Sequence, residues 1–493
     1  MKWPAAGALV VLAGLTGCGS QYRPVINPIV PTGPAAQPLS YVAVFSQPGL
    51  VPATDASTTP PCQRDSSGNV VAYTSPGVVT VLDSAGDSVS ANATLGNGPL
   101  TFALDPTGAN AFSENCDGTV SSLVVSGALQ SRNVNTSTLL PGSAPINALI
   151  LSSSSQYFVE QGRNAIAAMG GNPPTLKVEI TEIAPSVINL TGVGGAQRIY
   201  SISQGNSGTA GGLAWGACGT PSAVTVNGEA DGIDIESNSI SSRIPLGVCP
   251  VYGVTSADDK RAFILNRGSG TITVINAQTD QLDTVNASPY LNGTSTINLC
   301  NGATPCNAGP VDADFYSPGN LLVVSNYDND TVSVIDTSLD VFGNDAATFG
   351  KVLATIPVGS HPAGVSVLQD GSRAYVANEG IPCTGNNAAT CTTNGSASVV
   401  SLTSFTVLNT IQLGSTIPNP RSIASNYNNP AGNVFVGGQN SAYCGVIRTD
   451  TDTVSAQLLV QGNVVDLHTT NQYAAQSATN NNIQSRSVGS GEP

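Results

Sequence analysis

An internal repeat of short strand-like segments constrains the fold of this 493-residue chain more than any other feature. Five segments share one pattern, in which alternating apolar residues are followed at once by a turn of Asp, Asn, Pro or Gly. Units of this size cannot bury an apolar face alone, so they form a core only by packing against their neighbours. The five segments begin at Thr101, Gly253, Asp314, Gly364 and Ser422.

Three further strands complete each predicted unit. The second strand ends on an asparagine in four of the five units, and the third begins with a polar residue and alternates, as in Thr331–Asp336. A fourth strand such as 354–359 closes the unit before a proline opens the next. Four antiparallel strands repeated in this way predict the blades of a β-propeller. The terminal asparagines are Asn115, Asn266, Asn326 and Asn378.

The motifs Tyr375-Val376-Ala377-Asn378, Thr331–Asp336 and Ile356-Pro357-Val358-Gly359 resemble the YVTN-type β-propeller repeat. The resemblance is close over residues 247–415 and weakens toward the N-terminus. It implies an all-β propeller of four-stranded antiparallel blades. Eight predicted hairpins favour eight blades, although seven, common in that family, stays open because residues 145–196 are degenerate. The hairpins lie near residues 76, 117, 165, 228, 268, 328, 388 and 441.

The N-terminus predicts export and a lipid anchor. Residues 1–17 combine Lys2 with an apolar run that is too short to span a bilayer, as in a signal peptide. Leu15-Thr16-Gly17-Cys18 resembles the lipobox of bacterial lipoproteins, which implies that the Cys18 thiol carries a diacylglycerol. Gly19 and Ser20 supply no aspartate for inner-membrane retention, which favours the outer membrane or the periplasmic face of the envelope.

We therefore expect four segments: a lipoprotein signal peptide at 1–17, the lipidated cysteine and a proline-rich tether at 18–40, the propeller at 41–470, and a disordered polar tail at 471–493. The formal net charge is −15 with a pI of about 4.3. A chain this acidic repels a phosphate backbone, so we predict no nucleic-acid partner.

The cysteines predict oxidised clips. Nine remain after Cys18, and two pairs are close in sequence inside insertions, Cys300 with Cys306 and Cys383 with Cys391. We predict both pairs as disulfides, because the compartment is oxidising and no histidine lies at metal-ligand spacing. The total is odd, so at least one of the remaining thiols is free or pairs between molecules; these are Cys62, Cys116, Cys218, Cys249 and Cys444.

No catalytic, cofactor or metal site is predicted. The chain has no GxSxG elbow, Walker loop, HExxH motif or CxxCH haem site. The cluster Gly192, Gly194, Gly195 lacks the third glycine of a dinucleotide fingerprint, so it is interpreted as a loop or strand end. Asp328-Asn329-Asp330 fails the EF-hand spacing for calcium and is interpreted as a tight turn. His361 lies alone at a predicted connection between blades, where we expect a structural role.

These observations favour a non-catalytic binding or scaffolding propeller at the cell envelope. The alternatives are a propeller enzyme, lactonase-like or quinoprotein-like, and a structural surface-layer component. Strand alternation places the insertions Glu379–Ser396 and Asn286–Pro310 on the same rim of the ring, the first between two strands and the second between two blades. We expect a protein or small-ligand partner to dock on that rim, over the central channel, while Cys18 holds the chain at the membrane.

Overall fold

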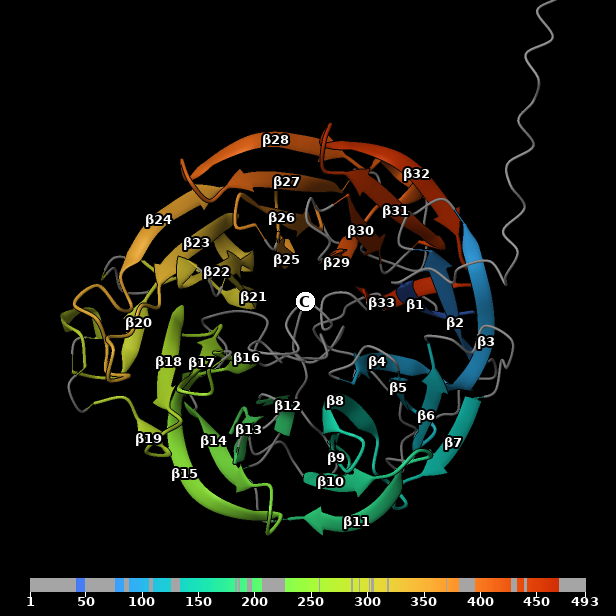
Figure 1. Cartoon of the computed structure of the whole chain (residues 1–493), viewed down its shortest axis with the longest axis horizontal. Helices are drawn as coiled ribbons and strands as arrows, with labels where there is room; N and C mark the ends of the chain where they lie inside the picture. The colour runs from blue at the N-terminus through green and yellow to red at the C-terminus, as the bar shows by residue number, and fades with distance from the viewer. Residues whose placement is uncertain are drawn as a thin grey trace, which may run out of the picture. The chain divides into compact units, whose positions relative to one another are not determined.

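The computed structural model shows a β-propeller of eight blades arranged around a central axis (Figure 1). The chain divides into two units, Met1–Leu39 and Ser40–Pro493, and the description below concerns the second. The structure describes residues 41–469 except 49–75, 84–87, 106–109, 126–133, 182–183, 185–186, 193–196, 206–226, 257, 285–286, 292, 301, 303–305, 317–318, 369, 381–394, 427–431 and 439–440.

Seven blades are antiparallel sheets of four strands, and in the remaining one, blade 5, the outer strand is split in two. This confirms the fold class and the count of eight. Blades 1 and 2 contain β1 (Tyr41–Gln47), β2 (Pro76–Asp83), β3 (Val89–Asn97) and β33 (Asn463–Thr469), then β4 (Pro99–Leu104), β5 (Asn110–Asn115), β6 (Thr119–Val124) and β7 (Val134–Thr138). Blades 3 and 4 contain β8 (Pro145–Ser152), β9 (Ser155–Glu160), β10 (Ala165–Gly170) and β11 (Thr175–Ile180), then β12 (Val187–Thr191), β13 (Arg198–Ser203), β14 (Asn227–Asp234) and β15 (Ser239–Val248).

Blade 5 contains β16 (Pro250–Thr255), β17 (Arg261–Asn266), β18 (Thr271–Asn276), β19 (Gln281–Leu282) and β20 (Thr296–Asn298), with the short helix η1 (Pro289–Leu291). Blade 6 contains β21 (Pro310–Tyr316), β22 (Leu321–Asn326), β23 (Thr331–Asp336) and β24 (Val352–Pro357), with η3 (Tyr327–Asn329). Blades 7 and 8 contain β25 (Pro362–Val367), β26 (Arg373–Asn378), β27 (Ser396–Ser401), β28 (Thr406–Gln412), η5 (Gly414–Thr416), β29 (Pro420–Ser425), β30 (Asn433–Gly438), β31 (Tyr443–Arg448) and β32 (Thr453–Leu459).

The strand directions define two ends of the propeller. The second strand of each blade ends where the inner strand begins, as the pairing of Pro99 with Asn115 shows, and we call this end the insert face. The opposite end, where inner strands end and third strands turn into fourth strands, is the turn face. All eight predicted hairpins are connections between second and third strands, so all of them lie on the insert face.

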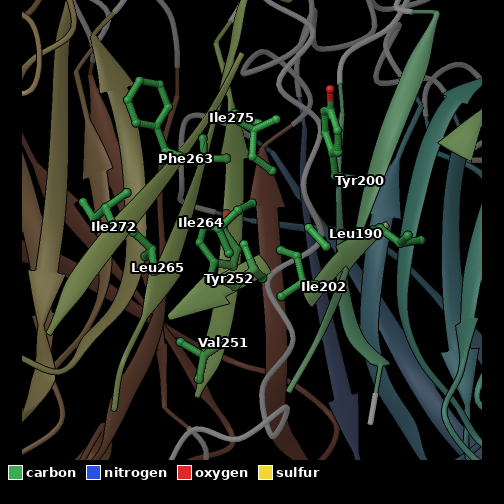
Figure 2. Packing of buried hydrophobic residues seen from close by; sticks show 14 of the residues in the cluster. Leu190, Tyr200, Ile202, Val251, Tyr252, Phe263, Ile264, Leu265, Ile272 and Ile275 are labelled. Atoms are coloured by element: carbon green, nitrogen blue, oxygen red, sulfur yellow. The ribbon is translucent and has the colours of Figure 1, made fainter. Parts of the chain in front are cut away.

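The core lies between neighbouring blades. In β17 all six residues are buried, because Ile264 and Leu265 point to opposite sides of the sheet and both sides are covered. Figure 2 shows the packing of blade 4, through Leu190, Tyr200 and Ile202, with residues of blade 5. Exposed and half-buried residues alternate strictly only in outermost strands such as β32. The third strands also alternate polar and apolar residues, a pattern that ordinarily indicates one exposed side, yet their polar residues are largely buried.

The asparagine that ends the second strand explains these buried polar residues. In blade 5, Asn266 Nδ2 donates to the hydroxyls of Thr271 and Thr273 at 3.2 and 2.9 Å. Asn115, Asn326 and Asn378 make the same pair of bonds to their own third strands. The amide thus fastens the second strand to the third and satisfies polar groups that the neighbouring blade covers.

A glycine from the preceding blade makes room for this asparagine. A Cβ on Gly359, just after β24, would lie 2.6 Å from the Asn378 amide, and Gly96 and Gly247 stand in the same relation to Asn115 and Asn266. The glycine at the end of the fourth strand is therefore required by the asparagine of the next blade in these three pairs.

We expect Gly359→Ala to destabilise the protein by about 1–3 kcal/mol, because the added methyl group overlaps the Asn378 side chain at a packed seam. Gly432→Ala is the matched control, since a Cβ there meets nothing within 4 Å. Urea unfolding of both variants measures the difference. Equal stability of the two would contradict the packing argument.

The ring closes by sharing one blade between the two ends of the described chain. Blade 1 takes β1, β2 and β3 from the N-terminal side and its inner strand β33 from the C-terminal side, in the order β3-β2-β1-β33 (Figure 1). The register pairs Val42 with Thr469 and Phe45 with Asp466. The closure therefore consists of a backbone ladder between residues more than 400 positions apart in the sequence.

Polar side chains join inner strands of neighbouring blades around the channel. Val365 N and Val367 N of β25 donate to the carboxylates of Asp312 and Asp314 on β21, each at 2.8 Å. These bonds satisfy backbone groups at the open edge of an innermost strand. Similar contacts join Asn147 to Leu190, Thr191 to Thr255, Ser366 to Ser425, and Ser425 to Thr469.

Candidate binding face

The long connections predicted to carry function belong largely to the insert face. Connections 48–75, 204–226 and 379–395 join second to third strands in blades 1, 4 and 7. By sequence position, every cysteine after Cys18 except Cys444 belongs to a connection of this face. Loops that a rigid scaffold holds and disulfides restrain are suited to presenting a binding surface.

One of the two predicted disulfide clips is confirmed. Cys300 and Cys306 form a disulfide with a Cα–Cα distance of 5.5 Å, and it packs on Gly270 in the β17–β18 turn. The insertion that contains this disulfide was expected to be a blade-to-blade connection over its whole length, residues 286–310, but part of it belongs to blade 5. Residues Thr296–Asn298 form β20 and pair with β18, so only 299–309 connects blades 5 and 6. The β-alternating Thr-Ile-Asn completes the outer edge of blade 5 after the interruption by η1.

The remaining cysteines divide into three groups. Cys116 and Cys249 are disulfide-bonded. Cys444 on β31 is a free and fully buried thiol, and burial raises its pKa to about 12, so this thiol is unreactive. The other cysteines lie outside the described residues: the predicted pair Cys383 and Cys391, the predicted lipidation site Cys18, and Cys62 and Cys218.

A belt of buried polar side chains crosses four successive blades at the insert face; we call Arg267, Tyr327, Glu379 and Arg421 the polar belt. Arg267 of blade 5 lies over the Tyr327 ring of blade 6, 5.0 Å from its centroid. The Tyr327 hydroxyl donates to Glu379 Oε2 of blade 7 at 2.8 Å. Arg421 of blade 8 donates to Glu379 Oε1 from Nη2 and Nε at 2.9 and 3.1 Å. Each link joins one blade to the next.

The belt is positioned by the ends of the second strands. Arg267, Tyr327 and Glu379 each follow the terminal asparagine of their blade, and their backbone N–H donates to the carbonyl of the residue before the inner-strand proline at 2.8–2.9 Å. That residue is left-handed in each blade: Cys249, Gly309 and His361, with φ of 52, 61 and 53°. Glu379 is also the first residue of the blade 7 connection, so the belt lies at the base of a predicted insertion.

The side chains of the polar belt are buried, and their charges compensate one another. All four side chains are almost fully buried, and burial next to Glu379 raises the pKa of Tyr327 far above its usual range, so the phenol stays protonated and donates. The Glu379–Arg421 ion pair neutralises two charges that would be costly alone.

We expect Glu379→Gln to destabilise the protein by about 3–5 kcal/mol, because it leaves the buried Arg421 cation without its counter-charge. Adding Arg421→Met to that variant should recover much of the loss, and the double-mutant cycle gives the coupling. Arg448→Met removes an exposed ion pair with Asp450 and should leave the stability nearly unchanged, because solvent screens a surface pair. Additive effects of the two belt substitutions would disprove the coupling.

Sequence candidates near the belt take structural roles. Asp328, which was considered as a calcium ligand, accepts hydrogen bonds from Arg267 Nη2 and Nε at 2.7 and 3.1 Å. Asp330 accepts a hydrogen bond from His361 N at 2.8 Å. The His361 ring packs against Tyr327 with centroids 4.7 Å apart. In the part of the chain that the structure describes, no group of three His, Cys, Asp or Glu side chains is placed to hold a metal ion.

Blade 3 replaces the terminal asparagine by a carboxylic acid. Glu160 occupies the position, and its third strand offers Ala165 and Ala167 where the four blades with a terminal asparagine offer hydroxyls. The Glu160 side chain is fully buried, and burial followed by the neighbouring Glu179 raises its pKa from 4.5 to about 8. Glu160 is thus mostly neutral at pH 7, while Arg163 pairs with Glu179.

The raised pKa of Glu160 makes stability depend on pH. The folded state holds this proton more tightly than the unfolded state, so its contribution is complete below pH 4.5 and is lost as pH rises through about 8. We expect Glu160→Gln to gain stability relative to the parent between pH 5 and 9, measured by urea unfolding at several pH values. The exposed Glu236→Gln is the control. A pH-independent difference would contradict this assignment.

Comparison with known proteins supports the fold and the compartment. Residues 255–426, less than half of the chain, match the family model of the Choice-of-anchor I domain. No curated protein matches the sequence. Together with the disulfides, the family match indicates an exported or surface protein. The structure describes no helix that is long and apolar enough to cross a membrane.

Solved structures show the same architecture at low identity. Apo AztD from Citrobacter koseri is similar over 87% of this chain and 98% of its own, with 13% identity and a TM-score of 0.55, and another AztD structure from that organism gives 0.53. Sqt1 from Saccharomyces cerevisiae is similar over 74% of this chain and 86% of its own, with 12% identity and a TM-score of 0.50. At these identities the likeness concerns the fold alone.

Proposed function

We propose that this propeller is an envelope-anchored, non-catalytic binding or scaffolding module whose partner docks on the insert face. The YVTN-type repeats supply a closed, rigid support, and the lipobox-like Cys18 supplies the anchor. The observation that carries the proposal is the asymmetry of the two ends. The connections 48–75, 204–226 and 379–395 and nearly all the cysteines belong to one of them.

The polar belt supports this assignment. It ties blades 5 to 8 together at the insert face, blade 5 through Arg267 and the others through Tyr327, Glu379 and Arg421, so the bases of the connections stay fixed relative to one another. A surface held in this way loses little conformational freedom when a partner binds. The belt residues use their polar groups on each other and on Asp328, which suits a support better than a reacting site.

Site-specific crosslinking in intact cells tests which face binds. Ser415 and Thr403 are both exposed hydroxyl residues of blade 7, the first in η5 on the insert face and the second in the β27–β28 turn on the turn face. A photoreactive phenylalanine analogue at Ser415 should give crosslinks to a protein partner, whereas the same group at Thr403 should give none.

Shortening the 381–394 segment, with Cys383 and Cys391 removed together, should abolish the Ser415 crosslinks and leave the melting temperature nearly unchanged. Melting should change little because the segment joins two strand ends that their own ladder already holds. Partner crosslinks that arise only from Thr403 would overturn the proposed face.

A further inference from the structure

The connection between β23 and β24, residues 337–351, presents the two most exposed large apolar side chains of the described residues. Val341 is 92% exposed and Phe342 82%, while the next, Leu459, is 63% exposed. Third strands end at the turn face, so this connection projects from the end of the propeller opposite the insert face. An apolar pair so completely exposed on a folded domain marks a contact site.

The tip is rigid. Phe342 N and Asn344 N both donate to Asp340 Oδ1, at 2.8 and 2.9 Å, and Asp340 N donates back to Asn344 O at 2.8 Å. Leu339 and Asp345 form a β-bridge below these bonds. Val341 and Phe342 are therefore held out to solvent by a closed loop.

The base of the loop is fixed by a buried cation. Arg261 is 2% exposed, and its Nε and Nη2 lie 2.6 and 3.0 Å from the carboxylates of Asp283 and Asp345. Arg261 Nη2 also donates to Gly343 O at 3.3 Å, within the tip itself. The loop of blade 6 is thus anchored to the body of blade 5.

The side chains beside the tip suit a lipid surface. Lys260 packs against Gly343, with its Nζ 3.3 Å from where a Cβ would lie, and Lys351 Nζ is 5.9 Å from the centroid of the half-exposed Tyr290 ring. These are two of the three lysines among the described residues. Apolar tips bordered by lysine and tyrosine match the layering of a bilayer, with hydrocarbon beneath phosphate headgroups.

The N-terminal tether joins the propeller at the same end. β1 is the second strand of blade 1 and begins at Tyr41 on the turn face, so residue 40 is bonded to the chain there. Residues 18–40, at no more than about 3.6 Å each, keep the turn face within several tens of ångström of any anchor at Cys18. Any such tether is therefore bonded to the propeller at the end that carries Val341 and Phe342.

We propose that the Val341–Phe342 tip inserts into the phospholipid bilayer that holds the tether, so that the turn face lies toward the membrane and the insert face away from it. The orientation rests on the proposed lipid anchor. The turn face also carries exposed carboxylates, namely Asp340 beside the tip and, farther away, Asp258, Asp370 and Asp450. Binding therefore relies on apolar insertion, and neither salt nor anionic lipid strengthens it.

Depth-dependent fluorescence in the lipidated full chain tests the insertion. The Phe342→Trp variant is reconstituted in phosphatidylcholine vesicles that contain lipids brominated in their acyl chains, where bromine quenches tryptophan fluorescence. The Leu408→Trp variant is the matched control, because Leu408 is an exposed apolar residue on β28. After subtraction of the unsubstituted protein, Trp emission at position 342 should fall about two-fold or more and emission at 408 should not. Absence of quenching at 342, or equal quenching at both, overturns the proposal.

Vesicle flotation of the full-length Cys18→Ala chain separates the tip from the anchor. Adding Val341→Ser and Phe342→Ser should lower partitioning into phosphatidylcholine vesicles about ten-fold or more at low and high salt, and adding Leu408→Ser and Leu459→Ser should not. If native protein proves to carry no lipid while the tip still drives flotation, the anchor fails and the insertion stands. If both double variants float like the Cys18→Ala chain, the insertion fails and the anchor stands.

Discussion

Every blade of this protein is apolar on both sides of its sheet, and the rest of the structure depends on that constraint. Strands such as β17, β27 and β30 are buried along their whole length, because each sheet is covered by a neighbour before and a neighbour after it. A row of such sheets would leave two apolar faces in water at its ends, whereas a ring leaves none. Polar chemistry is thereby confined to the channel, the outermost strands and the two ends.

The two ends of the ring use their polar residues differently. At the insert face, asparagines fasten strands within a blade and the polar belt fastens blades to each other, so long connections leave from fixed points. At the turn face, most connections are short turns, and the exception at 337–351 is braced by Arg261 between two carboxylates. A buried ion network of this kind adds little net stability but fixes geometry strongly.

The repeat units could be predicted from the sequence because their signals are local. Each hairpin is a turn of Asp, Asn or Gly between apolar runs, and each of the four predicted asparagines indeed ends a second strand. The split of the outer strand in blade 5 was missed, since Thr296–Asn298 is too short to stand out beside the insertion before it. Disulfide Cys300–Cys306 was predictable because its cysteines are close in sequence.

The candidate site was harder to predict, because its contacts join residues on different blades. Tyr327, Glu379 and Arg421 are each about 40–50 positions apart, and nothing in a single unit shows that they meet. The sequence held one signal. The residue after the terminal asparagine differs between successive units, being Arg267, then Tyr327, then Glu379, whereas a position that only packs the blade would keep the same residue type in every unit. Exposure of Phe342 was equally hidden, since an apolar residue in a long connection is as often buried as not.

The shared blade has a consequence for the order of folding. Seven blades take their four strands from consecutive sequence and can form from local hairpins, but blade 1 is incomplete until β33 reaches β1. Until then β1 has an unpaired edge with the apolar side chains of Val42 and Val44, which is a template for wrong pairing. Ring closure is a contact of very high sequence separation, so it comes late and limits the folding rate, and the nascent chain must be kept from aggregating until its last strand arrives.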